Sequence, residues 1–217
     1  ITRVRTAAVS ILGAKYLKRS DASVMGIIGC GQLGRAHLIA ACEYFNFKKA
    51  YCFDTFTEVS EKLVTDLQGF YGVEMVVSTS WQEVLEKSDV VFTCTVPDEP
   101  FLDCSYLKPG SVAVSIEGRQ VWKTEDYNKF DKLCVDEWNG MKEGGHVRDL
   151  VNTGKLTEDN IYADLEELVN QTKPGRENDK ENILLLTRGL GAEDVAIAQV
   201  YYERAKAAGL GIELTLF

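Results

Sequence analysis

The chain has 217 residues, of which 45% are apolar and 26% charged, and its formal net charge at pH 7 is −9. This composition is that of an ordinary globular protein with one sizeable core. The negative charge disfavours nucleic acid and anionic membranes as partners, and the absence of an apolar run of membrane-spanning length predicts no transmembrane helix.

The N-terminal segment predicts an amphipathic helix over Thr2–Leu17, because its apolar positions recur at helical spacing. Apolar strands and helices then alternate. Strands are expected at residues 24–28, 50–53, 73–77, 89–96, 111–116 and 132–135. Helices are expected at residues 33–45, 58–70 and 81–87 and around Thr124. This alternation is typical of βαβ units and predicts an α/β fold, a doubly wound parallel Rossmann sheet with strand order 3-2-1-4-5-6.

The pattern changes after Asp136. The later segments predict helices at residues 147–153 and 160–171, a solvated loop at 173–180, a strand at 183–186, a helix at 192–208 and a strand at 212–217. We expect three parts. Residues 1–20 would be a helix linking to a missing N-terminal domain, and residues 21–191 the dinucleotide-binding domain. Residues 192–217 would be a helix and strand returning to a largely absent substrate and dimerisation domain.

One segment, residues 24–54, predicts a dinucleotide site. A strand leads into a GxGxxG turn, a helix and a second strand follow, and Asp54 comes twenty residues after the last glycine. Gly29 permits the tight turn, Gly31 lets the backbone approach a pyrophosphate, and Gly34 lets the helix pack on the strand. The first turn of the helix offers N–H groups to the phosphates.

The carboxylate of Asp54 also predicts the cofactor. An acid at this position binds the adenosine ribose hydroxyls and repels a 2′-phosphate. Residues 55–58 contain no Arg or Lys that would bind such a phosphate. The sequence therefore favours NAD over NADP.

The six cysteines and two histidines form no CxxC motif and no cysteine–histidine cluster. Most of the cysteines lie in apolar runs, as buried thiols of a reducing compartment do. We therefore expect a cytoplasmic protein without a metal site.

Five short motifs resemble the ornithine cyclodeaminase/mu-crystallin family in their order and spacing. They are RTAAVS at residues 5–10, the GxGxxG at 29–34, TCT at 93–95, PGR at 174–176 and GLGAED at 189–194. The similarity covers essentially this whole chain, but only about the C-terminal two-thirds of a family member. It implies an NAD-dependent oxidoreductase that acts on an amino acid and forms a homodimer through the missing N-terminal domain.

Within that family the chain looks most like the dehydrogenases of 2,3-diaminopropionate biosynthesis, a route to siderophores and related metabolites. The likeness rests on residues 134–138, 150–156 and the acidic loop 174–181. Those enzymes oxidise N-(2-amino-2-carboxyethyl)-glutamate with NAD. Two alternatives stay open: an ornithine cyclodeaminase that makes proline and ammonia, and a mu-crystallin-like protein that binds nucleotide and ligand without turnover.

The resemblance also implies roles for single residues. Arg5 would bind the substrate carboxylate, with Arg188 and Asp194 beside the substrate. Besides the three glycines and Asp54, the implied cofactor contacts are Thr6, Gln32, Leu33, Thr95, Ser115, Ile116, Lys123 and Thr187.

One position departs from the cyclodeaminase pattern. The stretch G-x-D-x-x-x-K-x-E of those enzymes carries an Asp that transfers protons, and Arg119 stands in its place here. An arginine stays protonated at neutral pH and cannot act as a base. This puts cyclisation in doubt and leaves hydride transfer intact. We expect Arg119 to bind a second carboxylate and Glu117 to be the nearest alternative proton carrier, with the missing segment as another source of a base.

Overall fold

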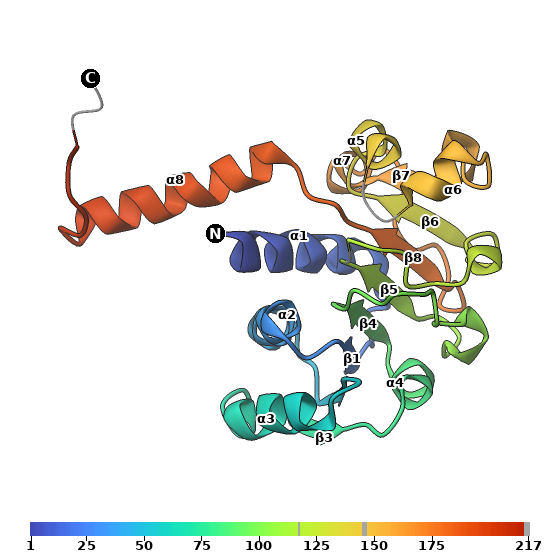
Figure 1. Ribbon diagram of the computed structural model, residues 1–217, viewed down its shortest axis with the longest axis horizontal. Coiled ribbons are helices and arrows are strands. Elements are labelled where there is room, and N and C mark those ends of the chain that lie inside the picture. Colours follow the sequence, from blue (N-terminus) through green and yellow to red (C-terminus); the bar gives the residue numbers. More distant parts are fainter. Residues whose placement is uncertain (117, 145–146, 215–217) are drawn as a thin grey trace.

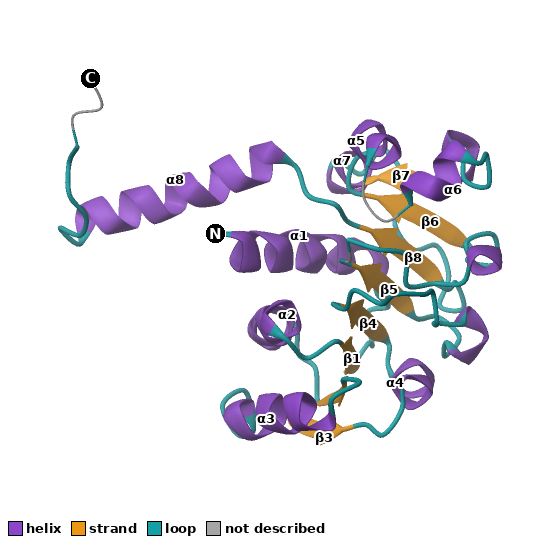
Figure 2. Cartoon of the chain, viewed as in Figure 1, coloured by secondary structure: helices purple, strands orange, loops and turns teal. Residues whose placement is uncertain are grey.

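The computed structural model describes residues 1–116, 118–144 and 147–214 (Figures 1 and 2). Its strands are β1 (Val24–Ile28), β2 (Lys49–Phe53), β3 (Glu74–Val77), β4 (Val90–Thr93), β5 (Val112–Ser115), β6 (Lys132–Val135), β7 (Ala163–Asp164) and β8 (Ile183–Leu186). Its α-helices are α1 (Thr2–Leu17), α2 (Gln32–Tyr44), α3 (Thr57–Leu67), α4 (Trp81–Lys87), α5 (Trp138–Glu143), α6 (Arg148–Asn152), α7 (Leu165–Val169) and α8 (Gly191–Ala207). Three short 3₁₀ helices, η1 (Cys104–Tyr106), η2 (Thr124–Asp126) and η3 (Glu158–Asn160), complete the described elements.

The strands form one parallel sheet in the order β3-β2-β1-β4-β5-β8-β6-β7. The doubly wound α/β fold is confirmed, and so is the predicted order of the first five strands. The prediction that β6 follows β5 is wrong, because β8 lies between them. All four residues of β8 are apolar and buried, which suits a central strand covered on both faces.

Helices cover both faces of the sheet (Figure 2). One buried cluster joins one face to residues of α1, α2, α3 and α7, and a second joins the other face to α4, α5 and α6. The helix predicted at Thr2–Leu17 is confirmed as α1 and packs on the sheet through Ile11, Ala14 and Leu17. A Cβ at Gly13 would overlap Leu185 of β8, so a glycine is needed where this helix crosses the strand.

The PGR motif at residues 174–176 ties the end of α1 to the sheet. Arg176 donates hydrogen bonds to the carbonyls of Leu17 (2.7 Å) and Glu181 (2.8 Å). A Cβ at Gly175 would overlap the Tyr16 carbonyl, so the loop can approach the helix only with glycine there. This motif, which contributed to the family resemblance, therefore has a structural role.

Three predicted elements differ from the structure. The helix predicted at 160–171 begins later, at Leu165, because Tyr162 donates to the carbonyl of Leu133 and the next residues pair with β6. The helix expected around Thr124 is a single 3₁₀ turn. In the predicted strand at 212–217, residues 212–214 have no strand structure and 215–217 lie outside the described residues.

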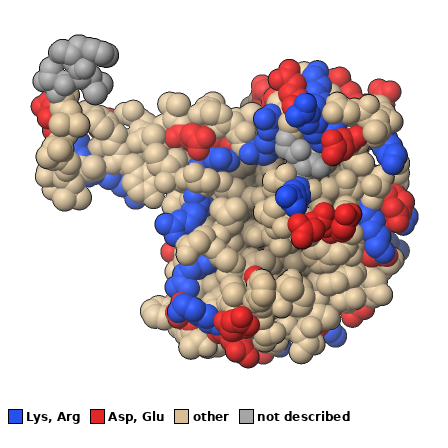
Figure 3. All heavy atoms as spheres, in the orientation of Figure 1, with Lys and Arg blue, Asp and Glu red and all other residues tan. Residues whose placement is uncertain are grey.

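Helix α8 projects from the body of the protein (Figures 1 and 3). None of its residues is buried, and Val195, Tyr201 and Tyr202 are each at least 49% exposed. Acidic and basic side chains are interspersed over the face that Figure 3 shows. No helix in the described part of the chain has the length and apolarity needed to cross a membrane.

Candidate functional site

The glycine turn lies where the winding of the sheet reverses, between β1 and β4. Gly29 has φ +92°, and a Cβ there would lie 2.5 Å from the Cys94 carbonyl oxygen. A Cβ at Gly34 would overlap the carbonyl oxygen of Gly29. At Gly31 a Cβ would meet nothing within 4 Å, so this surface of the turn is open to a ligand. Gly29 and Gly34 therefore meet steric constraints within the turn, and Gly31 leaves open space beside it.

The first turn of α2 leaves backbone donors available. Its N-cap residue is Gly31, which has no side chain that could accept a hydrogen bond from these donors. The N–H groups at Gln32 and Leu33 therefore point out of the helix with its partial positive charge, a geometry that binds anions. The side chain of Gln32 accepts a hydrogen bond from Arg3 at 2.5 Å, which adds a cation beside this turn.

Asp54 stands just beyond the end of β2, next to the turn. One carboxylate oxygen accepts from the N–H of Cys30 (2.8 Å) and the other from the N–H of Phe56 (3.1 Å). These two bonds fix the carboxylate and leave further lone pairs for ribose hydroxyls. Thr95 lies close to the turn on the other side. The Thr95 backbone nitrogen would be only 2.9 Å from a Cβ added at Gly29.

Arg5 and Asp194 meet, although 189 positions separate them. The Arg5 Nε lies 2.9 Å from an Asp194 oxygen, and its Nη1 lies 3.7 Å from Glu193. The Arg5 side chain is 12% exposed and lies against Gly189, where a Cβ would overlap the guanidinium. The structure thus brings two of the three predicted substrate residues together, between α1 and α8.

The third predicted substrate residue, Arg188, turns its side chain toward α5, where Nη1 donates to the Gly140 carbonyl. Its backbone N–H is held by Asp136, 2.6 Å away. Asp136 follows β6 and is only 4% exposed. Burial raises its pKa, while the N–H groups of Gly189, Arg188 and Glu137 act in the opposite direction.

Ser115 ends β5, Thr187 directly follows the neighbouring strand β8, and both residues are buried. The Ser115 hydroxyl lies 3.1 Å from that of Thr93 and accepts from the Trp122 indole at 3.0 Å. The Thr187 hydroxyl donates to the Ser115 carbonyl at 3.1 Å. Both side chains therefore brace the strand ends, and Ile116 follows them, also buried.

Thr6 lies on α1, where its side chain is buried and its carbonyl accepts from the Ser10 hydroxyl at 3.0 Å. Arg119 and Lys123 lie on the loop after β5. Arg119 forms an ion pair with Asp98 (3.0 Å), and both side chains are mostly exposed. Lys123 pairs with Asp103 (2.8 Å) on the face of the sheet that carries α4. Glu117 lies outside the described residues. The structure therefore does not join Arg119 or Lys123 to the pair of Arg5 and Asp194.

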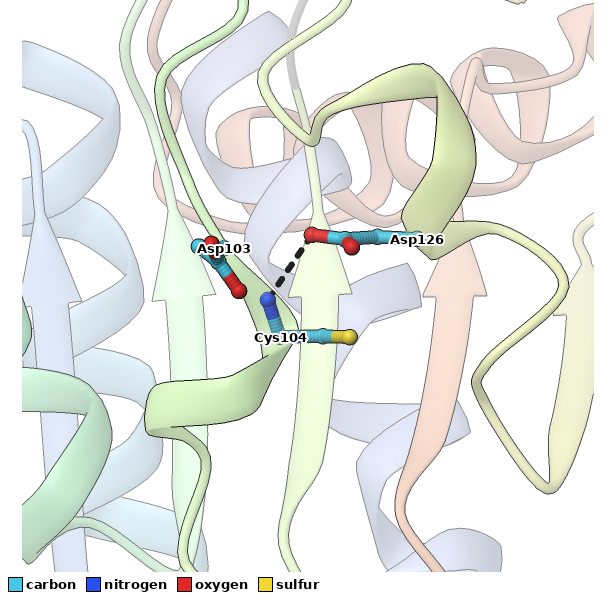
Figure 4. A group of neighbouring side chains, drawn as sticks. All are labelled: Asp103, Cys104 and Asp126. Atoms are coloured by element: carbon cyan, nitrogen blue, oxygen red, sulfur yellow. Dashed lines mark hydrogen bonds between the residues drawn. The ribbon is translucent and has the colours of Figure 1, made fainter.

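Asp103, Cys104 and Asp126 form a compact group whose ligand atoms lie within 4.8 Å of one another (Figure 4). Asp126 accepts from the Cys104 N–H and from Lys129, both at 2.8 Å, and Asp103 pairs with Lys123. Burial raises the pKa of the Cys104 thiol to about 12, so it stays protonated at neutral pH. Ammonium groups pair with both carboxylates, and the bond between the Cys104 N–H and Asp126 joins η1 to η2.

Asp136 was not among the predicted site residues. A sequence pattern could have indicated it, because Asp136 is an acid that directly follows an apolar strand. Side chains at the carboxyl ends of parallel strands line the ligand crevice.

A glycine turn at the switch point of a doubly wound sheet, with an acid at the end of the next strand, defines a Rossmann-type dinucleotide-binding domain. The chain belongs to the ornithine cyclodeaminase/mu-crystallin family, whose sequence profile matches residues 1–209. This confirms the resemblance.

The relatives agree with this assignment. N-((2S)-2-amino-2-carboxyethyl)-L-glutamate dehydrogenase of Staphylococcus aureus is 33% identical over all of this chain, which spans 65% of that protein. The Thermococcus litoralis Delta(1)-pyrroline-2-carboxylate reductase, solved with NADH and L-proline, is 32% identical with a TM-score of 0.91. That alignment covers 98% of this chain and 67% of the solved one. An archaeal alanine dehydrogenase dimer with bound NAD is 29% identical with a TM-score of 0.91, over 100% of this chain and 68% of that one.

Proposed function

We propose that this chain is the cofactor-binding part of an NAD-dependent oxidoreductase that acts on a C–N bond of an amino acid. The observation that carries the proposal is the arrangement of Asp54 beside the open glycine turn. Backbone N–H groups orient the carboxylate, and Gly31 leaves space for a pyrophosphate. The solved relatives with bound NAD or NADH support this choice of cofactor.

The chemistry would divide between cofactor and protein. When bound, NAD supplies the hydride acceptor. Arg5 would bind the substrate carboxylate through the guanidinium nitrogens that Asp194 does not engage. This contact would aim the carbon next to nitrogen at the nicotinamide, and loss of hydride from that carbon leaves an imine that water hydrolyses.

The substrate we propose is an amino acid with a secondary amine and several carboxylates, of the kind that the name of the S. aureus relative describes. Arg119 supports this choice, because among the described residues its guanidinium pairs only with the highly exposed Asp98 and can exchange that partner for a second substrate carboxylate. This substrate would place the protein in diaminopropionate or siderophore biosynthesis.

We also propose that α8 continues into a second domain and that the whole protein is a homodimer. The support is that no residue of α8 is buried, and that a solved relative is a dimer. Cys30, Cys52 and Cys134 are buried and form no disulfide, which supports the proposed cytoplasmic location.

Calorimetry with the complete protein tests the cofactor. NADH should bind, and Asp54→Ala should weaken binding about tenfold or more and reduce the preference over NADPH. Asp159→Ala, which removes an exposed acid of η3, is the matched control and should bind like the wild type. If the wild type takes up no NADH, or if Asp54→Ala binds it equally well, the proposal is wrong.

Turnover of NAD⁺ with N-(2-amino-2-carboxyethyl)-glutamate tests the reaction. A dehydrogenase accumulates NADH and 2-oxoglutarate. An ornithine cyclodeaminase returns its hydride, so it would release ammonia from ornithine without net NADH. A mu-crystallin-like binding protein would bind NADH and turn over neither compound.

A further inference from the structure

We propose that Asp136 is a positioning residue that holds the loop after β8 in place and thereby fixes the substrate-binding guanidinium of Arg5. This inference rests on the proposed role of Arg5 in substrate binding. It concerns a buried acid that the reaction itself does not use.

The Asp136 carboxylate accepts from three backbone donors, two of which belong to the loop after β8. One oxygen accepts from Arg188 (2.6 Å) and Gly189 (2.5 Å), and the other accepts from Glu137 (2.9 Å). The first two donors are consecutive residues of the loop between β8 and α8. A single carboxylate oxygen therefore sets the direction in which the chain leaves the sheet.

The position of the Arg5 side chain depends on the path of this loop, because Gly189 packs directly against the Arg5 guanidinium. Gly189 has φ +92°, and even a single added carbon at its Cβ position would overlap the Arg5 guanidinium. On the other side, Asp194 of α8 bonds to the Arg5 Nε at 2.9 Å, and α8 begins only two residues after Gly189. A shift of the loop would therefore move both Gly189 and the ion-pair partner of Arg5.

The charge of Asp136 matters as well as its shape. No cation pairs with it among the described residues, and its charge and those of Glu193 and Asp164 disfavour one another. Within the described part of the chain, its carboxylate bonds only to backbone N–H groups. In Asp136→Asn the amide keeps one acceptor oxygen, and its NH₂ group would face a backbone N–H donor. The substitution should release at least one of the two loop contacts.

Chemical labelling tests the inference without any substrate. Phenylglyoxal modifies arginines, and mass spectrometry can follow Arg5 and the exposed Arg3 on one peptide from α1. In Asp136→Asn, Arg5 should react about fivefold faster than in the wild type, because a loosened loop exposes it. Arg3 should keep its rate. Equal rates at Arg5 in both proteins, or equal acceleration at Arg5 and Arg3, would overturn the inference.

Two further variants separate the effect on the loop from a general effect of losing an acid or of misfolding. Asp164→Asn changes another acid at a neighbouring strand end, which accepts from Trp138 rather than from the loop, and should leave Arg5 labelling unchanged. Gly189→Ala displaces the same loop directly and should accelerate Arg5 labelling even if Asp136→Asn fails to fold. A normal rate at Arg5 in Gly189→Ala would refute the proposed coupling.

Kinetics with N-(2-amino-2-carboxyethyl)-glutamate give the functional readout. Asp136→Asn should raise KM about tenfold while NADH affinity stays within about twofold of the wild type. Combining it with Arg5→Lys should give less than the product of the two single effects, because both act on one contact. If the wild type does not oxidise this compound, the proposed function fails, and the labelling result still decides the role of Asp136.

Discussion

His37 should make the folded protein sensitive to mild acid. The ring is fully buried between α1 and α2. Its Nδ1 lies 2.7 Å from the Leu33 carbonyl and its Nε2 3.0 Å from the Ser10 hydroxyl. A carbonyl only accepts, so Nδ1 carries the proton of the neutral ring. Burial lowers the pKa of His37 to about 4, although the Leu33 carbonyl favours the charged form.

The size of the effect follows from proton linkage. In the unfolded chain the pKa of His37 returns to about 6.5, so the unfolded state binds the proton more tightly. Stability is therefore complete above about pH 6.5 and is lost as the pH falls toward 4. The two pKa values give a loss of about 2 kcal/mol at pH 5 and about 3 kcal/mol below pH 4.

Urea unfolding of the wild type and of His37→Gln at pH 7.5 and pH 5.0 measures this. Glutamine keeps a polar group of similar reach and does not titrate. The wild type should lose about 2 kcal/mol more than the variant between the two pH values, because the contributions of the carboxyl groups cancel in the comparison. An equal loss in both proteins would refute the assignment of a neutral, buried His37.

Three further substitutions should change stability in defined directions, each measurable by urea unfolding at pH 7.5. The hydroxyl of Ser88 is buried without a hydrogen-bond partner among the described residues, so Ser88→Ala should be neutral or raise stability by up to about 1 kcal/mol. Gly34→Ala should lower stability by more than about 1 kcal/mol and abolish NADH binding, because the new methyl group overlaps the Gly29 carbonyl. Arg19→Met should cost about 1.5 to 3 kcal/mol, because it removes one 2.6 Å partner of the buried Asp89 carboxylate and leaves Lys108 as the other.

The sequence predicted most reliably what neighbouring residues determine. Helix α1 has the predicted bounds because its apolar spacing is local. The glycine turn could be predicted for the same reason, since Gly29 and Gly34 each meet a steric constraint from nearby backbone. The place of β8 was missed because strand order depends on contacts between distant segments. The same holds for the start of α7, where pairing with β6 overrides helical spacing up to Asp164.

The candidate site also has a part that depends on local sequence and a part that depends on contacts between distant segments. Its cofactor half comes from one continuous segment, so a motif could identify Gly31 and Asp54. Its substrate half joins α1, the end of β6 and the start of α8, and the role of Asp136 follows only from folded contacts. Resemblance named Arg5 and Asp194, but only the structure shows that they touch.

The surroundings of Arg5 also bear on the kind of substrate. A simple carboxylate that bound Arg5 would compete with Asp194, which lies 2.9 Å from the Arg5 Nε. It would also approach the carboxyl group of Glu193, whose pKa is raised by burial. An amino acid carries its own cation, so its ammonium or secondary amine can bind these acids while its carboxylate takes the free side of the guanidinium. Each of these partly exposed charges then keeps an opposite partner, which a plain carboxylic acid would not provide. The acids beside Arg5 thus favour an amino acid over a plain carboxylic acid, in line with the proposed chemistry at a C–N bond.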